Sequence, residues 1–543
     1  MTDFSWLVPL PVVLPLSAAG LTLALYRRPR VQRVVSVVTL SLVLVAAVGL
    51  LVLADDEPRT AEIGGWATPV GIGLVADRLS ALMLTISAAV VLCVLIYSLA
   101  QGLAGEQFAP ISVFHPTYLV LVAGVANAFL SGDLFNVYVG FEILLAASYV
   151  LITLGGTRER LRAGSIYVIV ALLSSVLFLA AIAGVYAATG TLNLAQLALR
   201  LDEIDPGVRL VLQVMLLVAF AVKAAVFPLS AWLPDSYPTA PAPVTAVFAG
   251  LLTKVGIYAM LRTQTLLFPG GDVDSWLMVL ALATMVIGIL GAVAQDDIKR
   301  LLSFTLVSHI GFMVFGLALG SSAGWTAAIY YVAHHITVQT ALFLVAGLME
   351  RYGGSLSLTR LGGLARLAPA VAILFFLPAM NLAGIPPLSG FLGKAGLLEA
   401  GVAVGTPLAW ALVVGSVLTS LLTLYALVKA WNKAFWQEPP AEMPRRRVPR
   451  AMVGATGGLV AFSLLLTFAA GPLYGYAERA ATALQERTPY ISAVLPEGDR
   501  GTGESADLPD ASAGDPAEPA ASSDPRPEPS DDPTPRLVTE ETP

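Results

Sequence analysis

Four ionisable side chains lie deep inside long apolar stretches of the chain, where a charge is costly. They are Glu142, Lys223, Lys254 and Lys394. Glu142 lies about nine residues into its stretch, hence ~14 Å deep if the stretch is a helix crossing a ~30 Å hydrocarbon core. Each such charge costs about 2.5–3.5 kcal/mol, or about 10–14 kcal/mol for four unpaired and unhydrated groups. These side chains are therefore expected to face one another or water.

Lysine and glutamate at these depths could carry protons. An ion pair that only ties helices together is the alternative, but one carboxylate cannot neutralise three lysines in pairs. Burial favours the neutral form of a lysine, whereas a nearby carboxylate favours its charged form. A Glu142–Lys223 pair that forms and breaks would therefore switch the proton affinity of Lys223. This predicts a proton relay.

Histidine side chains add possible steps between the lysines, because an imidazole can pass a proton through its two ring nitrogens. His309 shares a helix face with Thr305, and His335 shares one with Gln339, since each pair is four residues apart. The pattern predicts that His309, His334 and His335 belong to the relay. An interhelical hydrogen bond without proton transfer is the alternative for each of them.

Two similar segments interrupt apolar stretches that are otherwise helical. "FPLSAWLP" occupies residues 227–234 and "PPLSGFLG" residues 386–393, which places prolines at Pro228, Pro386 and Pro387. Backbone groups that a proline frees inside a bilayer are tolerated only beside other helices or a water-lined cavity. The breaks fall in the seventh and twelfth predicted spans, so the two copies cross the membrane in opposite directions. This predicts the inverted repeat of transporters, in which broken helices border the ion path.

The composition places these segments in a membrane. Of 543 residues, 57% are hydrophobic and only 13% are charged, which is too few to cover a soluble protein of this size. Because one crossing takes ~20 apolar residues, we predict an all-α polytopic membrane protein with about fourteen spans. The spans lie near residues 5–25, 32–53, 79–100, 113–131, 133–154, 163–188, 208–232, 238–262, 275–294, 301–320, 324–348, 367–402, 407–430 and 451–473.

Basic connectors follow only the odd-numbered spans, for example "YRRPRVQR" after the first and "PRRRVPR" after the thirteenth. By the positive-inside rule, this places both termini outside the cytoplasm in a multi-pass protein of the cell membrane. The predicted divisions are helices 1–3, the first five-helix repeat (helices 4–8), the inverted second repeat (helices 9–13), a basic cytoplasmic loop with helix 14, and an external, largely disordered acidic Pro-rich tail. Their boundaries are residues 1–112, 113–265, 266–432, 433–475 and 476–543.

Motifs for other chemistry are absent from the sequence. Cys93 is the only cysteine, which excludes a disulfide framework or a cysteine-based metal motif within the chain. The sequence has no Walker loop, no dinucleotide fingerprint, no Gly-x-Ser-x-Gly elbow and no His-Glu-x-x-His motif. We therefore expect a transporter subunit rather than an enzyme, with no cofactor and no nucleic-acid partner.

Four longer segments of the chain carry a resemblance to known proteins. They are residues 114–157, 222–262, 296–313 and 379–400. Together they resemble a known family, the antiporter-like subunits of respiratory complex I, membrane-bound hydrogenases and Mrp-type multisubunit cation/proton antiporters. The resemblance covers about residues 5–475, and parts of it are most similar to the Mrp type's D component.

The resemblance implies fourteen helices, with inverted repeats of spans four to eight and nine to thirteen. It also implies a central hydrophilic axis of proton transfer through Glu142, Lys223, Lys254 and Lys394. One position departs from the pattern, because many complex I relatives carry a lysine where this chain has Gln339. That departure leaves His334 or His335 as the candidate relay group of the eleventh span.

The implied function is exchange of external protons for cytoplasmic Na⁺ or another monovalent cation. The implied partners are the other membrane subunits of a hetero-oligomer, similar to the A, B, C, E, F and G components of the Mrp type, together with the lipid bilayer. A proton-pumping subunit of an NADH dehydrogenase or a membrane-bound hydrogenase is the first alternative. The second alternative is an assembly scaffold whose buried charges no longer carry protons.

Overall fold

The computed structural model describes residues 4–102, 113–440, 443–444 and 446–495. In this part of the chain, twelve helical spans are long and apolar enough to cross a membrane, and two shorter apolar helices, α4 (Phe114–Leu130) and α16 (Pro369–Ala383), complete the predicted fourteen. The twelve are Ser5–Ala24, which contains α1 (Leu10–Ala24), α2 (Pro29–Asp56), α3 (Arg78–Gln101), α5 (Leu134–Thr153), α6 (Arg158–Thr189), α8 (Pro206–Ala224), α10 to α11 (Ala242–Leu266), α12 (Asp274–Val293), α13 (Ile298–Ala318), α14 (Ser322–Gly353), Pro407–Trp436, which contains α18 (Pro407–Trp431), and α19 (Arg450–Phe468).

Both predicted helix breaks are confirmed. The seventh span ends as α8 at Ala224, and the chain resumes a helix only at the short α9 (Trp232–Ser236). The twelfth span, predicted as one unusually long segment, consists of two half-helices, α16 and α17 (Ser389–Val404). In each case the Pro-Leu-Ser sequence lies in or beside the break, as expected where proline removes a backbone donor.

Matching contacts in the two halves support the inverted repeat. Asp133 caps the start of α5 and forms a β-bridge with Asn193, and Asp297 caps the start of α13 and forms a β-bridge with Ser357. Asp297 follows Asp133 by the same number of residues as Ser357 follows Asn193. Close helix crossings repeat at the same spacing along the chain. If Gly124 carried a Cβ atom, that atom would lie 2.6 Å from the backbone nitrogen of Leu144. A Cβ atom on Gly288 would lie even closer to the backbone nitrogen of Ser308. Only glycine permits crossings this close.

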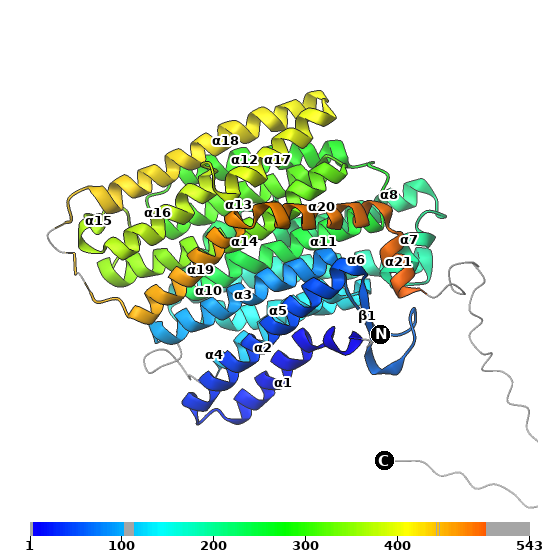
Figure 1. The fold of residues 1–543 in the computed structure, drawn as a ribbon, viewed down its shortest axis with the longest axis horizontal. Helices are drawn as coiled ribbons and strands as arrows, with labels where there is room; N and C mark the ends of the chain where they lie inside the picture. The colour runs from blue at the N-terminus through cyan, green and yellow to red at the C-terminus, as the bar shows by residue number, and fades with distance from the viewer. Residues whose placement is uncertain (1–3, 103–112, 441–442, 445, 496–543) are drawn as a thin grey trace, which may run out of the picture. The chain divides into compact units, whose positions relative to one another are not determined.

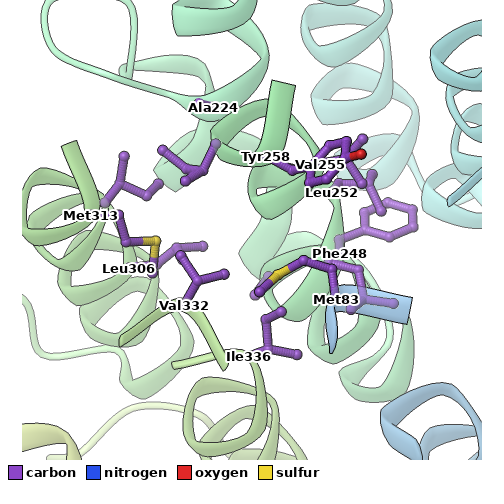
Figure 2. Packing of buried hydrophobic residues seen from close by; sticks show 14 of the residues in the cluster. Met83, Ala224, Phe248, Leu252, Val255, Tyr258, Leu306, Met313, Val332 and Ile336 are labelled. Carbon is purple, nitrogen blue, oxygen red and sulfur yellow. The ribbon is translucent and has the colours of Figure 1, made fainter. Parts of the chain in front are cut away.

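Two spans that carry candidate relay groups, α10–α11 and α14, lie at the centre of the helix bundle. Figure 1 shows α18 along one edge of the bundle, α1 along the opposite edge and α14 between them. The most apolar stretches of α14 and of the α10–α11 span are entirely buried, whereas less than half of the corresponding stretch of α6 is buried. Figure 2 shows side chains of these inner helices in close contact, among them Leu252 and Val332. Polar groups on α11 and α14 are therefore shielded from lipid by other helices.

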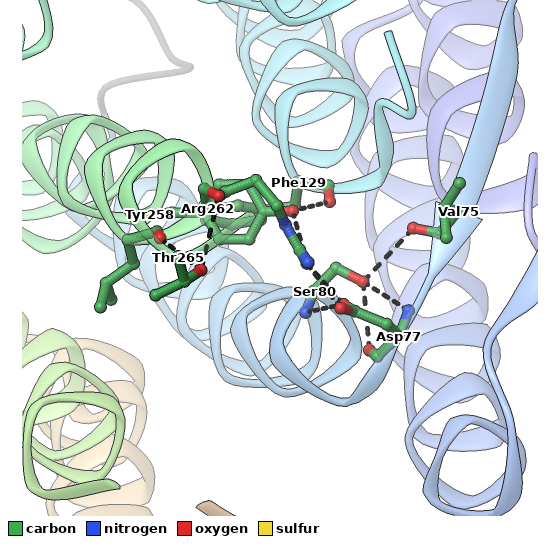
Figure 3. Close-up of polar contacts among 8 residues, drawn as sticks. Val75, Asp77, Ser80, Phe129, Tyr258, Arg262 and Thr265 are labelled. Atoms are coloured by element: carbon green, nitrogen blue, oxygen red, sulfur yellow. Dashed lines mark hydrogen bonds and ion pairs between the residues drawn. The ribbon is translucent and has the colours of Figure 1, made fainter. Parts of the chain in front are cut away.

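A buried ion pair joins the third and eighth spans (Figure 3). Asp77 caps α3 in a reciprocal capping box with Ser80, and its carboxylate accepts a hydrogen bond of 2.7 Å from Arg262 of α11. The Arg262 guanidinium also lies 4.9 Å from the ring centre of Tyr490. Breaking a buried pair of this kind costs about 3–5 kcal/mol. The pair therefore fixes α11, which also carries Lys254, against α3.

Small elements follow or connect the spans. A two-stranded antiparallel sheet, β1 (Arg59–Glu62) and β2 (Gly73–Ala76), lies between α2 and α3. Residues 476–494, which the sequence assigned to the beginning of the tail, are helical in α20 (Ala470–Glu486) and α21 (Thr488–Val494). Arg479 of α20 holds Asp55 through two hydrogen bonds, of 2.7 and 2.9 Å. The rest of the predicted tail, residues 496–543, lies outside the described residues.

The remaining described helices are short. They comprise the helices that follow the sixth and eleventh spans, α7 (Leu194–Arg200) and α15 (Leu364–Leu367), five-residue π-helical turns at Phe248–Leu252 and Asn432–Trp436, and 3₁₀ turns at Ser5–Leu7, Ile63–Gly65 and Tyr237–Thr239.

Candidate functional site

The structure brings Glu142 and Lys223 together in the first repeat. The Lys223 ammonium lies 4.0 Å from a carboxylate oxygen of Glu142. Ser175 of α6 connects them, because its hydroxyl donates to the Glu142 carboxylate and accepts a 3.2 Å hydrogen bond from Lys223. The Lys223 side chain is 4% exposed and that of Glu142 31% exposed. The lysine is thus held in the interior, with its counter-charge nearer the surface of the chain.

Ser175 was not predicted from the sequence. Serine hydroxyls in apolar helices usually bond to a carbonyl of their own helix, as Ser98 does to Val94, so residue type alone gives no signal. The position of Ser175 between two ionisable groups follows only from how α6 is rotated against α5 and α8. Because a serine hydroxyl can donate one hydrogen bond and accept another, Ser175 can connect the Lys223 ammonium to the Glu142 carboxylate although the two lie 4.0 Å apart.

Ser175→Ala is expected to lower cation-driven proton movement about tenfold, because a hydrogen bond to a charged group is worth about 1.5–3 kcal/mol. Activity would be measured in membrane vesicles that contain the complete complex. Ser98→Ala is the matched control, since it removes a buried hydroxyl that bonds only within α3. Equal activities of the two variants would rule out a bridging role for Ser175.

The break after Lys223 is held open by specific contacts. Ala225 adopts a left-handed backbone conformation, with φ of 59°, directly after the last turn of α8. The Trp232 indole returns to donate a 3.2 Å hydrogen bond to the carbonyl of Val222. The amide of Phe227 donates to the Thr284 hydroxyl of α12 at 3.0 Å. Side chains thus satisfy backbone groups that the missing helix turn would otherwise leave unpaired inside the membrane.

Lys254 lies at the centre of the bundle, on the span whose helix widens into a π-helical turn at Phe248–Leu252. Its ammonium donates a 2.6 Å hydrogen bond to the carbonyl of Ala249, within that turn. Lys254 is fully buried, and among the described residues no carboxylate lies within ion-pair distance of it. A π-turn is often found at functional sites in helices, and here it supplies the one hydrogen bond to this lysine that the structure identifies.

Two of the predicted relay groups, His309 of α13 and His335 of α14, lie next to each other. The rings of His309 and His335 lie 5.3 Å apart, centre to centre. One nitrogen of His309 forms a 2.5 Å hydrogen bond with the Tyr331 hydroxyl, and the other lies 3.5 Å from the hydroxyl of Thr423. His334, the neighbour of His335 in the chain, forms a 3.0 Å hydrogen bond with Ser389 at the start of α17. The histidines therefore extend from the bundle centre to the second helix break.

Lys394 occupies that second break. Its ammonium donates to the carbonyls of Leu382 and Ala383, at 3.1 and 3.0 Å, which are the last residues of the half-helix α16. The end of a helix carries about half a negative charge, so it stabilises a cation in the absence of a carboxylate. Ser389, which bonds His334, begins the second half-helix, α17. Lys394 and His334 are thus attached to the two sides of one break.

Gln339 is buried beside these groups but differs from them in its contacts. Its amide donates a 2.7 Å hydrogen bond to the carbonyl of Leu302 on α13. By contrast, neither ring nitrogen of His335, one turn earlier on α14, has a hydrogen-bond partner in the described part of the chain. Gln339 therefore has a structural contact that His335 lacks.

Taken together, these groups define an ion-translocating type of membrane protein. Each of the two broken spans has a lysine beside its break, and a further lysine and buried histidines lie on α11, α13 and α14. Inverted repeats with broken helices at the centre of the bilayer are typical of secondary transporters.

The comparisons with known proteins agree with this assignment. Residues 131–419 match the model of a family described as NADH:quinone oxidoreductase/Mrp antiporter, transmembrane. The match covers more than half of the chain, and the chain therefore belongs to this family.

Similar proteins extend the comparison over most of the chain. The D component of a Na⁺/H⁺ antiporter of Alkalihalophilus pseudofirmus is 42% identical over 499 residues, which are 90% of this chain and 99% of the relative. The D component of the Na⁺/H⁺ antiporter of Bacillus subtilis is 36% identical, with 90% and 99% covered.

Two solved structures resemble the fold. A chain of the Mrp complex from Dietzia sp. has a TM-score of 0.86 at 34% identity, covering 91% of this chain and 100% of that one. A chain of respiratory complex I from Thermus thermophilus has a TM-score of 0.76 at 25% identity, with 89% and 99% covered.

Proposed function

We propose that this chain is the D-type membrane component of a multisubunit antiporter that exchanges cytoplasmic Na⁺, or a similar monovalent cation, for external protons. The observation that carries the proposal is the contact of the buried Lys223 with Ser175 and the half-buried Glu142 in one repeat, and the position of the buried His334 and Lys394 in the other. These side chains can bind and release protons without leaving the membrane interior. The names of the relatives and the likeness to the Mrp complex support it.

The proposed relay runs between the two helix breaks. Lys223 exchanges protons under the influence of Glu142, Lys254 and His335 occupy the centre, and His309, His334 and Lys394 complete the path. The proposed repeats are residues 113–265 and 266–432, and both termini lie outside the cytoplasm, as the basic connectors indicate. Each charge that moves through 100 mV is worth about 2.3 kcal/mol, so inward protons can drive cation export when more protons enter than cations leave.

A second candidate function is proton pumping in a complex with a redox arm. The likeness to a chain of respiratory complex I favours it, since the fold is shared at a TM-score of 0.76. The two functions require the same buried side chains in this chain and differ in the partners. We propose a transporter subunit that has no enzymatic reaction of its own, because the relatives with high identity are antiporter subunits.

The experiment that tests the proposal is purification of the tagged chain in mild detergent, followed by identification of the chains that accompany it. Small membrane subunits without a redox protein are expected. The purified complex in liposomes should then exchange Na⁺ for protons, whereas the isolated chain should show no cation-dependent proton movement. Accompanying flavin- or iron–sulfur-containing subunits would favour the redox alternative, and antiport by the isolated chain would contradict the subunit role.

A further inference from the structure

A buried tyrosine beside the first break has a polar group without a structural use. Tyr237 is fully buried, and its hydroxyl has no hydrogen-bond partner within the described residues. Its ring packs edge-on against Trp232, with centres 5.6 Å apart, and lies 5.6 Å from the ring centre of Phe248. Phenylalanine would make these ring contacts equally well. An unpaired buried hydroxyl costs stability, so its presence calls for another explanation.

Tyr237 shares a cavity with the candidate relay. A cavity of about 20 Å³ beside the break is lined by Lys223, Trp232 and Tyr237, among other residues. This volume is large enough for one water molecule. The ammonium and the phenolic hydroxyl are polar groups of two residues that border it, and both can bond to such a water. A relay between Lys223 and Tyr237 therefore requires a water molecule in this cavity.

The segment that follows Tyr237 leads toward a charged pair at the end of the spans. Lys299, in the first turn of α13, donates a 3.1 Å hydrogen bond to the carbonyl of Ala240. Its ammonium also lies 3.4 Å from the carboxylate of Glu350, in the last turn of α14. The Lys299 side chain is 3% exposed, whereas that of Glu350 is 41% exposed. The partly exposed Glu350 carboxylate, which can exchange protons with water, is thus connected through Lys299 to the segment that begins at Tyr237.

We propose that the Tyr237 hydroxyl is a proton-relay group that links Lys223 to the cytoplasmic surface at Glu350; this rests on the proposed function and its orientation. A proton released by Lys223 passes to the cavity water, which transfers a proton to the Tyr237 hydroxyl. The hydroxyl releases its own proton to water on the Glu350 side, and the Glu350 carboxylate accepts it. Tyr237 is neutral before and after the transfer, and protons can follow the same steps in reverse.

Tyr237→Phe in the complete complex tests this role, because it removes one oxygen and leaves the ring. Cation-driven proton movement in everted vesicles is expected to fall about tenfold or more, since relay by a positioned side chain contributes factors of about 10²–10⁴ and water can replace part of it. Tyr118→Phe is the matched control. That variant removes a buried hydroxyl with a 2.8 Å hydrogen bond to the carbonyl of Val91, so a purely structural view predicts the larger loss there. Near-normal activity of Tyr237→Phe would overturn the proposal.

Assembly of the complex, followed by immunoblot on the same vesicles, gives a second readout that does not depend on transport. Tyr237→Phe should assemble normally, because the hydroxyl that it removes has no hydrogen-bond partner in the described part of the chain. Loss of assembly in Tyr237→Phe would assign the hydroxyl a structural role and would also overturn the proposal. If the unmodified complex transports and Lys223→Arg does not, the proposed function stands whatever the outcome at Tyr237.

Discussion

Lys223→Arg is expected to abolish proton movement by the complex although it preserves the positive charge. Arginine can donate to Ser175 and pair with Glu142, as Lys223 does in the structure. It cannot take part in a relay, because a guanidinium is effectively never deprotonated in proteins. We expect a loss of at least about 100-fold, in the range that a positioned proton-transfer group contributes. The substitution therefore separates a relay from an ion pair that only joins α5 to α8.

The measurement is the cation-induced pH change in everted vesicles, with immunoblots to establish that the complex is assembled. Lys429→Arg is the control for the chemistry of the substitution. Lys429 donates to the carbonyls of Val293 and Gln295 at 2.9 Å and lies 3.3 Å from Asp296, so arginine can replace it without a relay being lost. Near-normal transport by Lys223→Arg would reduce Lys223 to a structural charge.

The two lysines at the breaks have different counter-charges, which bears on their roles. Lys223 faces a full carboxylate through Ser175, whereas Lys394 donates to the carbonyl end of α16 and has no carboxylate within ion-pair distance among the described residues. A carboxylate can gain a proton or move, so the stabilisation that it gives a lysine can be switched. The partial charge of a helix end is fixed as long as the helix is intact. Switching of proton affinity is therefore expected in the first repeat, with the second repeat responding to it.

The spans and breaks could be predicted from sequence because their causes are local. A run of apolar residues fixes a crossing, and a proline within it removes a backbone donor whatever surrounds it. The buried charges could be found for the same reason, since the cost of a charge in hydrocarbon singles out Glu142 or Lys254 without knowledge of its neighbours. The pairing of Glu142 with Lys223 was a hypothesis, and the structure places the two charged groups 4.0 Å apart. The cost of burial alone did not select Lys223, because pairing with Lys254 or Lys394 would lower that cost equally.

The partners of these charges depend on helix rotation and could not be predicted. Ser175, Tyr331 and Thr423 contact candidate relay groups, but hydroxyls are frequent in apolar helices and mostly bond to their own backbone. The Asp133–Asn193 bridge and its repeat at Asp297 and Ser357 were also missed. Each involves only a few residues and becomes recognisable as a repeat once the pairing of distant segments is known.

His335→Leu is expected to reduce proton movement about 100-fold, and Gln339→Leu only slightly. The two residues lie one turn apart on α14, and both are fully buried. Considerations of stability predict the opposite order. Gln339→Leu breaks a 2.7 Å hydrogen bond to Leu302, whereas His335→Leu removes a ring whose nitrogens have no partner among the residues that the structure describes. A larger loss of transport at His335 can therefore be explained by proton transfer and not by damage to the fold.

The comparison requires transport and assembly to be measured on the same vesicles. If the order of effects is reversed, with Gln339→Leu the more severe, the contact with Leu302 and the packing of α14 on α13 would account for both results. His335→Gln refines the test, because glutamine retains hydrogen-bonding groups near that position but cannot bind and release a proton near neutral pH. Its failure, together with near-normal activity of Gln339→Leu, would place the proton-carrying group of the eleventh span at His335, adjacent to the ring of His309.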